Sequence, residues 1–178
     1  MNKEVYSRTK KTVGDWETPP YFFKLLEEKL LKAGTHFTLD ACASPSNAKC
    51  EKYFTKEEDG LEQDWQGETV FVNPPFSHVA EWSQKCFEES QKKNTVVVMI
   101  IPPRTDTRYW DEWIMRCHEV LCCKGRVNFL KNGERTKNGS TFPLLIIIFK
   151  KTNRPNPILK MFYHKESDWR AVFKKKRR

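Results

Sequence analysis

The chain lacks the residue spacings that indicate a zinc site or a disulfide framework. Its six cysteines include no Cys-x-x-Cys pair, and its four histidines show no metal-ligand spacing. The adjacent Cys122 and Cys123 lie in an apolar, strand-like run, as is typical of buried, reduced thiols. We therefore expect free thiols and no bound metal.

Long apolar segments are also missing. An apolar run such as residues 144–149 is far too short to cross a bilayer. The first 16 residues contain no apolar stretch of the kind found in secretory signals. These absences predict a cytoplasmic protein that is neither secreted nor held in a membrane.

Glycine is scarce, with seven residues in a chain of 178, and none falls in a G-x-G-x-x-G or G-K-[ST] pattern. A loop that cradles phosphates is therefore not expected. The first apolar run, 37–42, nevertheless contains Asp40, and a carboxylate at a strand end commonly orients a nucleoside-type cofactor. A nucleoside cofactor without phosphates fits this combination, which favours S-adenosylmethionine.

Positive charge is in excess. The chain has 32 Lys and Arg against 23 Asp and Glu, a formal net charge of +9 and a pI near 9.3. This balance indicates a polyanionic partner, with nucleic acid ahead of an acidic membrane surface, although charge that serves solubility alone would look the same. Residues 1–14 are expected to form a flexible basic arm, and residues 171–178 a basic tail.

Apolar, β-branched runs alternate with amphipathic segments along the chain. Strands are expected at 37–42, 52–55, 69–72, 95–101, 119–123, 126–130 and 144–149, and helices at 21–31, 79–93 and 107–116. This alternation, with continuous apolar strands, predicts a doubly wound α/β sheet whose ligands bind beyond the carboxyl ends of the strands. Asp40, Asn73 and Pro102 would then line one rim.

The tetrapeptide Asn73-Pro74-Pro75-Phe76 directly follows the strand predicted at 69–72. Its two prolines stiffen the turn, so that the Asn73 side chain and the Pro74 carbonyl become a rigid pair of acceptors. Such a pair can hold both hydrogens of an exocyclic amino group, and Phe76 offers a flat face for a base removed from its stack. Taken alone, however, the tetrapeptide is more simply explained as a turn that ends a strand.

Six segments, in this order and at this spacing, resemble the phage-type, Dam-like DNA N6-adenine methyltransferases. They are Asp15–Pro20, Leu39–Ser44, Asn47–Cys50, Leu61 with Trp65, Asn73–Ser77 and Pro103–Thr107. The resemblance implies a Rossmann-like doubly wound sheet of the S-adenosylmethionine-dependent methyltransferase type, mostly parallel with an antiparallel C-terminal strand. The length of the chain and the lack of an internal linker predict one domain over residues 15–170. The resemblance also implies site-specific methyl transfer from S-adenosylmethionine to N6 of adenine in double-stranded DNA.

The resemblance assigns roles to individual residues. Contacts to the methyl donor are implied for Trp16, Thr18, Pro19, Asp40, Ala41 and, by a weaker match, Asp64. The resemblance also implies that the catalytic residues are Asn73, Pro74, Pro75 and Phe76. DNA contacts are expected from Arg104, Thr105, Arg108, Arg126, Lys174, Lys175 and Lys176. No separate recognition domain is inserted, so loops such as 104–112 and 131–141 would read the target sequence.

Two positions depart from a common pattern, because many amino-methyltransferases carry Asp in place of Asn73 and Tyr in place of Phe76. An amide accepts a hydrogen bond but is not a base, so catalysis would depend on positioning and polarisation of the amino group. The group that receives the methyl group is not determined by the tetrapeptide, since cytosine N4 or an amino group in RNA or protein could be held by the same two acceptors. A catalytically inactive DNA-binding or anti-restriction module is the non-enzymatic alternative.

Two of these side chains also have structural explanations. Asp40 could cap a helix, and Trp16 could be an ordinary core aromatic. Trp82 is expected in the core and not at a ligand.

Overall fold

The computed structural model describes residues 16–135 and 142–164. The predicted arm and the predicted tail, with Lys174, Lys175 and Lys176, lie outside the described residues. Residues 136–141, part of the loop 131–141 that is expected to read the target sequence, also lie outside them.

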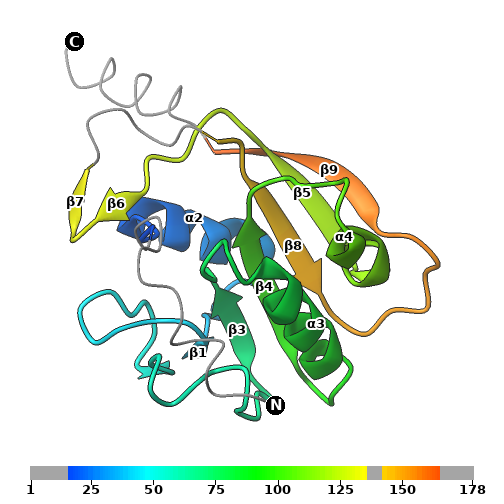
Figure 1. Cartoon of the computed structure of the whole chain (residues 1–178), viewed down its shortest axis with the longest axis horizontal. Coiled ribbons are helices and arrows are strands. Elements are labelled where there is room, and N and C mark those ends of the chain that lie inside the picture. The colour runs from blue at the N-terminus through cyan, green and yellow to red at the C-terminus, as the bar shows by residue number, and fades with distance from the viewer. Residues whose placement is uncertain (1–15, 136–141, 165–178) are drawn as a thin grey trace.

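A seven-stranded sheet lies at the centre of the described chain (Figure 1). Its order is β2-β1-β3-β4-β8-β5-β9. The strands are β1 (Leu39–Asp40), β2 (Lys52–Tyr53), β3 (Thr69–Val72), β4 (Val96–Ile101), β5 (Glu119–Lys124), β8 (Leu145–Phe149) and β9 (Ile158–Tyr163). Within this sheet, β8 alone runs antiparallel to its neighbours. A separate hairpin consists of β6 (Leu130–Lys131) and β7 (Glu134–Arg135).

Helices cover both faces of this sheet. On one face lies α2 (Pro20–Leu30), and on the other lie α3 (Val79–Ser90), α4 (Arg108–Glu112) and the 3-10 helix η1 (Ile114–Arg116). Side chains of β4 alternate between two apolar clusters, with Val97, Met99 and Ile101 on the α3 side and Val98 and Ile100 on the α2 side. The predicted doubly wound, mostly parallel α/β sheet is confirmed.

The antiparallel strand is β8, the last strand that the sequence predicts, and it lies between β4 and β5. It is not the C-terminal strand, because the chain continues into β9, which lies parallel to β5 at the edge of the sheet. The sequence signal for β9 is weak, since Lys160 interrupts its apolar run and Pro155 and Pro157 precede it.

The sheet strand predicted at 126–130 is wrong. Gly125, with φ of 90°, turns the chain away from the sheet after β5. Val127 and Phe129 are buried in the cluster beneath α2, and this inward alternation gave the strand-like pattern. The two predicted helices 79–93 and 107–116 are also shorter than expected, because α3 ends at Ser90 and the second segment divides into α4 and η1.

The carboxyl ends of the parallel strands meet at one edge of the sheet. Asp40 ends β1, Asn73 follows β3 and Pro102 follows β4, and all three residues line one cleft, as their positions at strand ends predicted. Since β5 and β9 are parallel to β4, they end at the same edge, and the described chain leaves it at His164. Within the described segments, no helix combines the length and apolar character needed to span a bilayer.

Candidate active site

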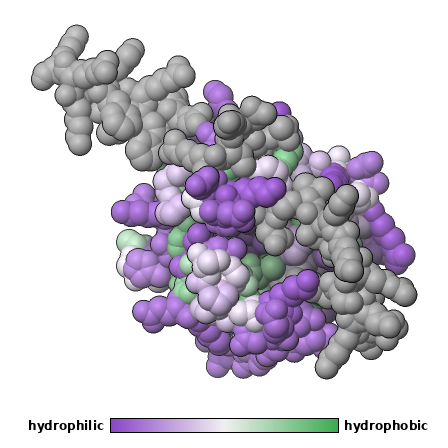
Figure 2. Space-filling view, turned by 60° about the vertical axis from the view of Figure 1, so that its left-hand side comes forward, coloured by the Kyte–Doolittle hydropathy of each residue, from purple (hydrophilic) through white to green (hydrophobic). Residues whose placement is uncertain are grey.

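A cleft of about 970 Å³ opens at the carboxyl edge of the sheet. Its walls come from residues 16–18, from the ends of β1, β3 and β4 with the loops that follow them, and from Phe142 and Pro143. Small-ligand sites usually measure about 300–1,000 Å³, so this one can hold a nucleoside with a second planar group beside it. Figure 2 shows a largely hydrophilic face on which hydrophobic residues appear in smaller areas.

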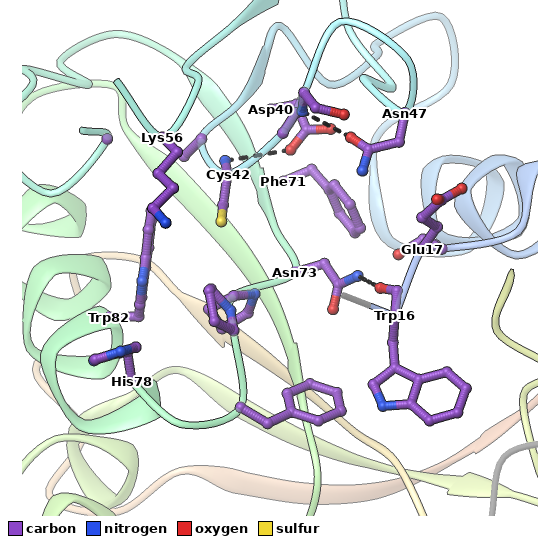
Figure 3. A pocket seen from close by; sticks show the side chains of 18 of the residues that line it. Trp16, Glu17, Asp40, Cys42, Asn47, Lys56, Phe71, Asn73, His78 and Trp82 are labelled. Carbon is purple, nitrogen blue, oxygen red and sulfur yellow. Dashed lines mark hydrogen bonds between the residues drawn. The ribbon is translucent and has the colours of Figure 1, made fainter. Parts of the chain in front are cut away.

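Asn73 is held by the main chain of Trp16. Its Nδ2 donates a hydrogen bond of 2.5 Å to the Trp16 carbonyl, and Figure 3 shows the amide oxygen pointing away from that contact. Asn73 Oδ1 is buried and accepts no hydrogen bond from the described residues. The next carbonyl, that of Pro74, also accepts none within the described chain, whereas the Pro75 carbonyl accepts the His78 N–H at 2.9 Å. Two neighbouring acceptors on residues that line the cleft are therefore without a donor in the described chain.

Aromatic rings stand beside this pair of acceptors. Phe76 meets Phe142 edge to face, with ring centroids 5.1 Å apart and planes at 89°. The Trp16 ring lies 6.0 Å from Phe142 and 6.5 Å from Phe129, again edge to face. The cleft that Asn73 lines therefore also offers flat apolar surfaces, as a stacked base requires.

Asp40 lies deep in the other part of the cleft, with 3% of its surface exposed. Its two carboxylate oxygens accept the Cys42 N–H at 3.4 Å and the Lys49 N–H at 3.0 Å. Burial raises the pKa of Asp40 from 3.8 to about 6, although both hydrogen bonds act to lower it. Each oxygen keeps a further lone pair for a ligand. Asp40 thus orders the loop after β1, but it does not cap a helix.

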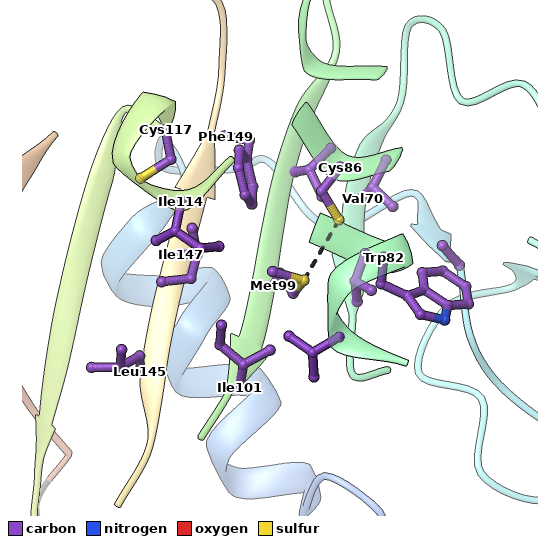
Figure 4. Packing of buried hydrophobic residues seen from close by; sticks show 14 of the residues in the cluster. Val70, Trp82, Cys86, Met99, Ile101, Ile114, Cys117, Leu145, Ile147 and Phe149 are labelled. Atoms are coloured by element: carbon purple, nitrogen blue, oxygen red, sulfur yellow. Dashed lines mark hydrogen bonds between the residues drawn. The ribbon is translucent and has the colours of Figure 1, made fainter. Parts of the chain in front are cut away.

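Two more polar atoms of cleft residues, Thr18 Oγ1 and Trp82 Nε1, are buried without a partner in the described chain. The sequence placed Trp82 in the core, and its ring does stack on Trp65 with centroids 6.1 Å apart. However, the indole nitrogen points away from Met99 and the sheet (Figure 4), and the residue also lines the cleft. Trp82 is therefore a candidate ligand contact that the sequence missed.

Gly60 allows the loop after β2 to lie directly on the end of β1. A Cβ atom built at Gly60 would lie 2.1 Å from the Ala41 carbonyl oxygen and 3.1 Å from Cη2 of Trp82. Both contacts are residues of the cleft, so this close approach shapes its floor. The only sign in the sequence was a glycine in a chain with few of them.

Comparison with known proteins identifies the family. A family model described as DNA N-6-adenine-methyltransferase (Dam) matches residues 6–171. The chain belongs to this family. It is 30% identical over 148 residues to the DNA N-6-adenine-methyltransferase of Haemophilus phage HP1. The aligned region covers 81% of this chain and 83% of that protein. A protein of the same name from Escherichia phage T1 is 29% identical over 107 residues, 60% of this chain and 43% of that protein.

Membership of the Dam family confirms the prediction that this chain is a DNA N6-adenine methyltransferase. The structure brings most of the predicted site residues of this Dam-family chain together. Trp16, Thr18, Asp40, Ala41 and the whole tetrapeptide Asn73–Phe76 line the cleft. Among the described residues, no group of three or more His, Cys, Asp or Glu side chains could hold a metal ion.

Two predicted cofactor contacts do not line the cleft. Pro19 precedes α2, and its carbonyl accepts the N–H groups of Phe22 and Phe23. Asp64 lies outside, where its exposed carboxylate pairs with Lys92 at 2.8 Å. The adjacent Trp65 N–H bonds to Glu89 at 3.0 Å, so the chain at this point is anchored to α3. These placements do not favour a cofactor role for either residue.

The predicted DNA contacts have different surroundings. Arg104 lines the cleft and is exposed, and Thr105 is exposed beside it. Arg108, at the start of α4, is paired with Glu112 at 2.6 Å. Arg126 is exposed just after β5, which ends at the edge where the cleft opens.

Proposed function

We propose that this Dam-family chain transfers a methyl group from S-adenosylmethionine to N6 of adenine in double-stranded DNA, and that Asn73 and Pro74 hold the amino group. The observation that carries the proposal is the buried Asn73 Oδ1, which has no donor in the described chain although Asn73 lines a ligand-sized cleft. A buried acceptor without a donor costs about 1–3 kcal/mol, and an N–H of a bound base would recover this energy.

The part of the cleft around Asp40 fits the methyl donor. Asp40 keeps acceptor sites for hydroxyl or ammonium groups, and Thr18 Oγ1 and Trp82 Nε1 are further buried polar atoms without partners in the described chain. S-adenosylmethionine carries hydroxyls, an ammonium group and ring nitrogens but no phosphate, which suits a cleft without a phosphate-binding loop. When bound, it supplies an electrophilic methyl group.

The tetrapeptide handles the acceptor. Asn73 Oδ1 and the Pro74 carbonyl accept the two N6 hydrogens and aim the nitrogen lone pair at the methyl group. Because an amide takes no proton, these residues act by positioning and polarisation, and the methylated amine loses its proton to solvent. Phe76 and Phe142 offer the surface on which a base flipped out of the duplex lies.

The DNA approaches over the exposed cations at the mouth of the cleft. Arg104 can meet the backbone beside the flipped nucleotide, since it is exposed and lines the cleft. Arg126 is exposed after a strand that ends at the same edge of the sheet. The basic residues 174–178 add positive charge that phosphates can attract.

Transfer of tritiated methyl groups to DNA, followed by nucleoside analysis, tests the proposal. We expect labelled N6-methyladenine, and in Asn73→Ala a loss of turnover on the order of a hundredfold or more, with donor affinity retained in calorimetry. The matched control is Gln84→Ala, which removes an exposed amide from α3 and should leave turnover unchanged.

Other outcomes separate the alternatives. Label in cytosine N4 or in RNA would identify a different acceptor, and no transfer at all would favour an inactive DNA-binding module. Near-normal turnover of Asn73→Ala would contradict the catalytic assignment.

A further inference from the structure

The nitrogen and the oxygen of the Asn73 amide have different surroundings. Its nitrogen donates to the Trp16 carbonyl at 2.5 Å, while its oxygen is buried without a donor in the described chain. A backbone carbonyl only accepts hydrogen bonds, so the nitrogen must face Trp16 and the oxygen must face the other way.

The Trp16 carbonyl is held in place by the contacts of the next residue, Glu17, and by those of the Trp16 ring. Glu17 exchanges two main-chain hydrogen bonds of 2.9 Å with Leu130 of β6, and its carboxylate accepts the Gly133 N–H at 3.2 Å. The Trp16 ring packs edge to face against Phe129 and Phe142. The carbonyl therefore cannot turn away from Asn73 without breaking contacts with the β6–β7 hairpin.

We infer that the Trp16 carbonyl acts as a positioning group that fixes the Asn73 amide in its working orientation, and that it makes asparagine the required residue at this position. The inference rests on the proposed function, because it concerns the acceptor that holds the target amino group. An ionised aspartate has no donor, so one of its oxygens would face the carbonyl oxygen at hydrogen-bond distance. A protonated aspartate could donate to the carbonyl and restore the geometry. Substitution by aspartate is therefore tolerated only while that side chain carries a proton.

The pH profile of Asn73→Asp relative to the native chain tests this inference. At neutral to alkaline pH, we expect the turnover of Asn73→Asp to be lower than that of the native chain by on the order of tenfold or more. The ratio of variant to native turnover should rise as the pH falls from about 9 to about 6, because above its pKa the protonated fraction of a carboxyl grows about tenfold for each unit by which the pH falls. Using this ratio cancels the pH dependence of groups common to both proteins. Asn73→Ala should show a low ratio that does not change with pH.

Two results would overturn the inference, namely native turnover of Asn73→Asp at alkaline pH, or a ratio that does not rise toward lower pH. Either result leaves the proposed function intact as long as Asn73→Ala is inactive, so the two failures are distinguishable. Melting temperature and donor affinity show whether each variant is folded.

A second measurement on the native chain does not depend on any variant's stability. In ¹⁵N spectra, one Asn73 side-chain N–H should exchange with solvent more slowly, by about tenfold or more, than those of the exposed Asn132. Equal exchange rates at both sites would also overturn the inference.

Discussion

Main-chain groups hold two polar side chains of the cleft, those of Asp40 and Asn73. The Asp40 carboxylate accepts hydrogen bonds from the main-chain N–H groups of Cys42 and Lys49, and the Asn73 amide donates one to the carbonyl of Trp16. These partners are present whatever side chain a neighbour carries, so the orientation of both residues depends on the path of the backbone. At the scale of the residue, the site is therefore sensitive to backbone shifts.

The ionisation of Asp40 predicts a pH dependence of donor binding. Since burial raises the pKa of Asp40 to about 6, the carboxylate is a full acceptor only above that pH. We expect the affinity for S-adenosylmethionine to fall as the pH drops below about 6, by up to about tenfold per pH unit. Calorimetry on the native chain and on Asp40→Asn checks this, because the asparagine variant should bind more weakly and without this dependence. The same pH dependence in both proteins would assign it to another group.

The same pKa also has a consequence for folding. Between pH 3.8 and about 6 the native chain holds a proton on Asp40 that the unfolded chain has lost. The contribution of Asp40 to the free energy of unfolding therefore decreases as the pH rises through this window.

At the scale of elements, β1 and β2 are short, with two residues each. The positions of these short strands depend on the segments that pack against their ends. The loop after β2 packs against the end of β1 through Gly60. The cleft floor is thus built by a contact between loops and not by a long strand.

Substitution of Gly60 by alanine should damage this contact. The new Cβ would lie 2.1 Å from the Ala41 carbonyl oxygen, and main-chain atoms must then shift. We expect a loss of about 1–3 kcal/mol in the free energy of unfolding, with weaker binding of S-adenosylmethionine. The control is Glu62→Ala, an exposed change two residues further along the chain. Native donor affinity in folded Gly60→Ala would show that this contact does not shape the cofactor site.

Over the whole molecule, positive charge occurs at both edges of the sheet. Lys93, Lys150 and Lys151 lie around the start of β4 and the end of β8, opposite the cleft. The described chain ends at His164, just after β9 reaches the carboxyl edge, and the basic residues Lys174–Arg178 follow in sequence. The described chain therefore ends at the edge where the cleft opens.

Replacing Lys174, Lys175 and Lys176 by glutamine should weaken binding to all DNA sequences alike. Each lost phosphate contact lowers the slope of log affinity against log salt by about 0.9. Binding titrations over a salt series measure this slope, and the methylated sequence should stay the same because phosphates carry no direct sequence information. The same replacement of Lys93, Lys150 and Lys151 removes equal charge from the opposite edge and should change the slope less. Equal effects of the two triple variants would reduce the role of the tail to net charge.

The sequence alone determined the family, the doubly wound sheet and the common rim of Asp40, Asn73 and Pro102. These features follow from short patterns, since an apolar strand and the residue at its end are encoded next to each other. Parallel strands then place their carboxyl ends at one edge without further information.

Only the tertiary structure decided which polar atoms are left without partners and which residues meet. Trp16 and Asn73 are 57 positions apart, and the contact between the Trp16 carbonyl and Asn73 Nδ2 depends on the β6–β7 hairpin. Gly60 lines the cleft because it packs against the end of β1 and against Trp82. Asp64 lies outside the cleft, since the chain beside it is anchored to α3 and its carboxylate pairs with Lys92. The strand predicted at 126–130 failed for the same reason, because burial beneath α2 and pairing in a sheet give the same local alternation of apolar residues. Contacts between distant segments are set by the close packing of the whole chain, which no local pattern records.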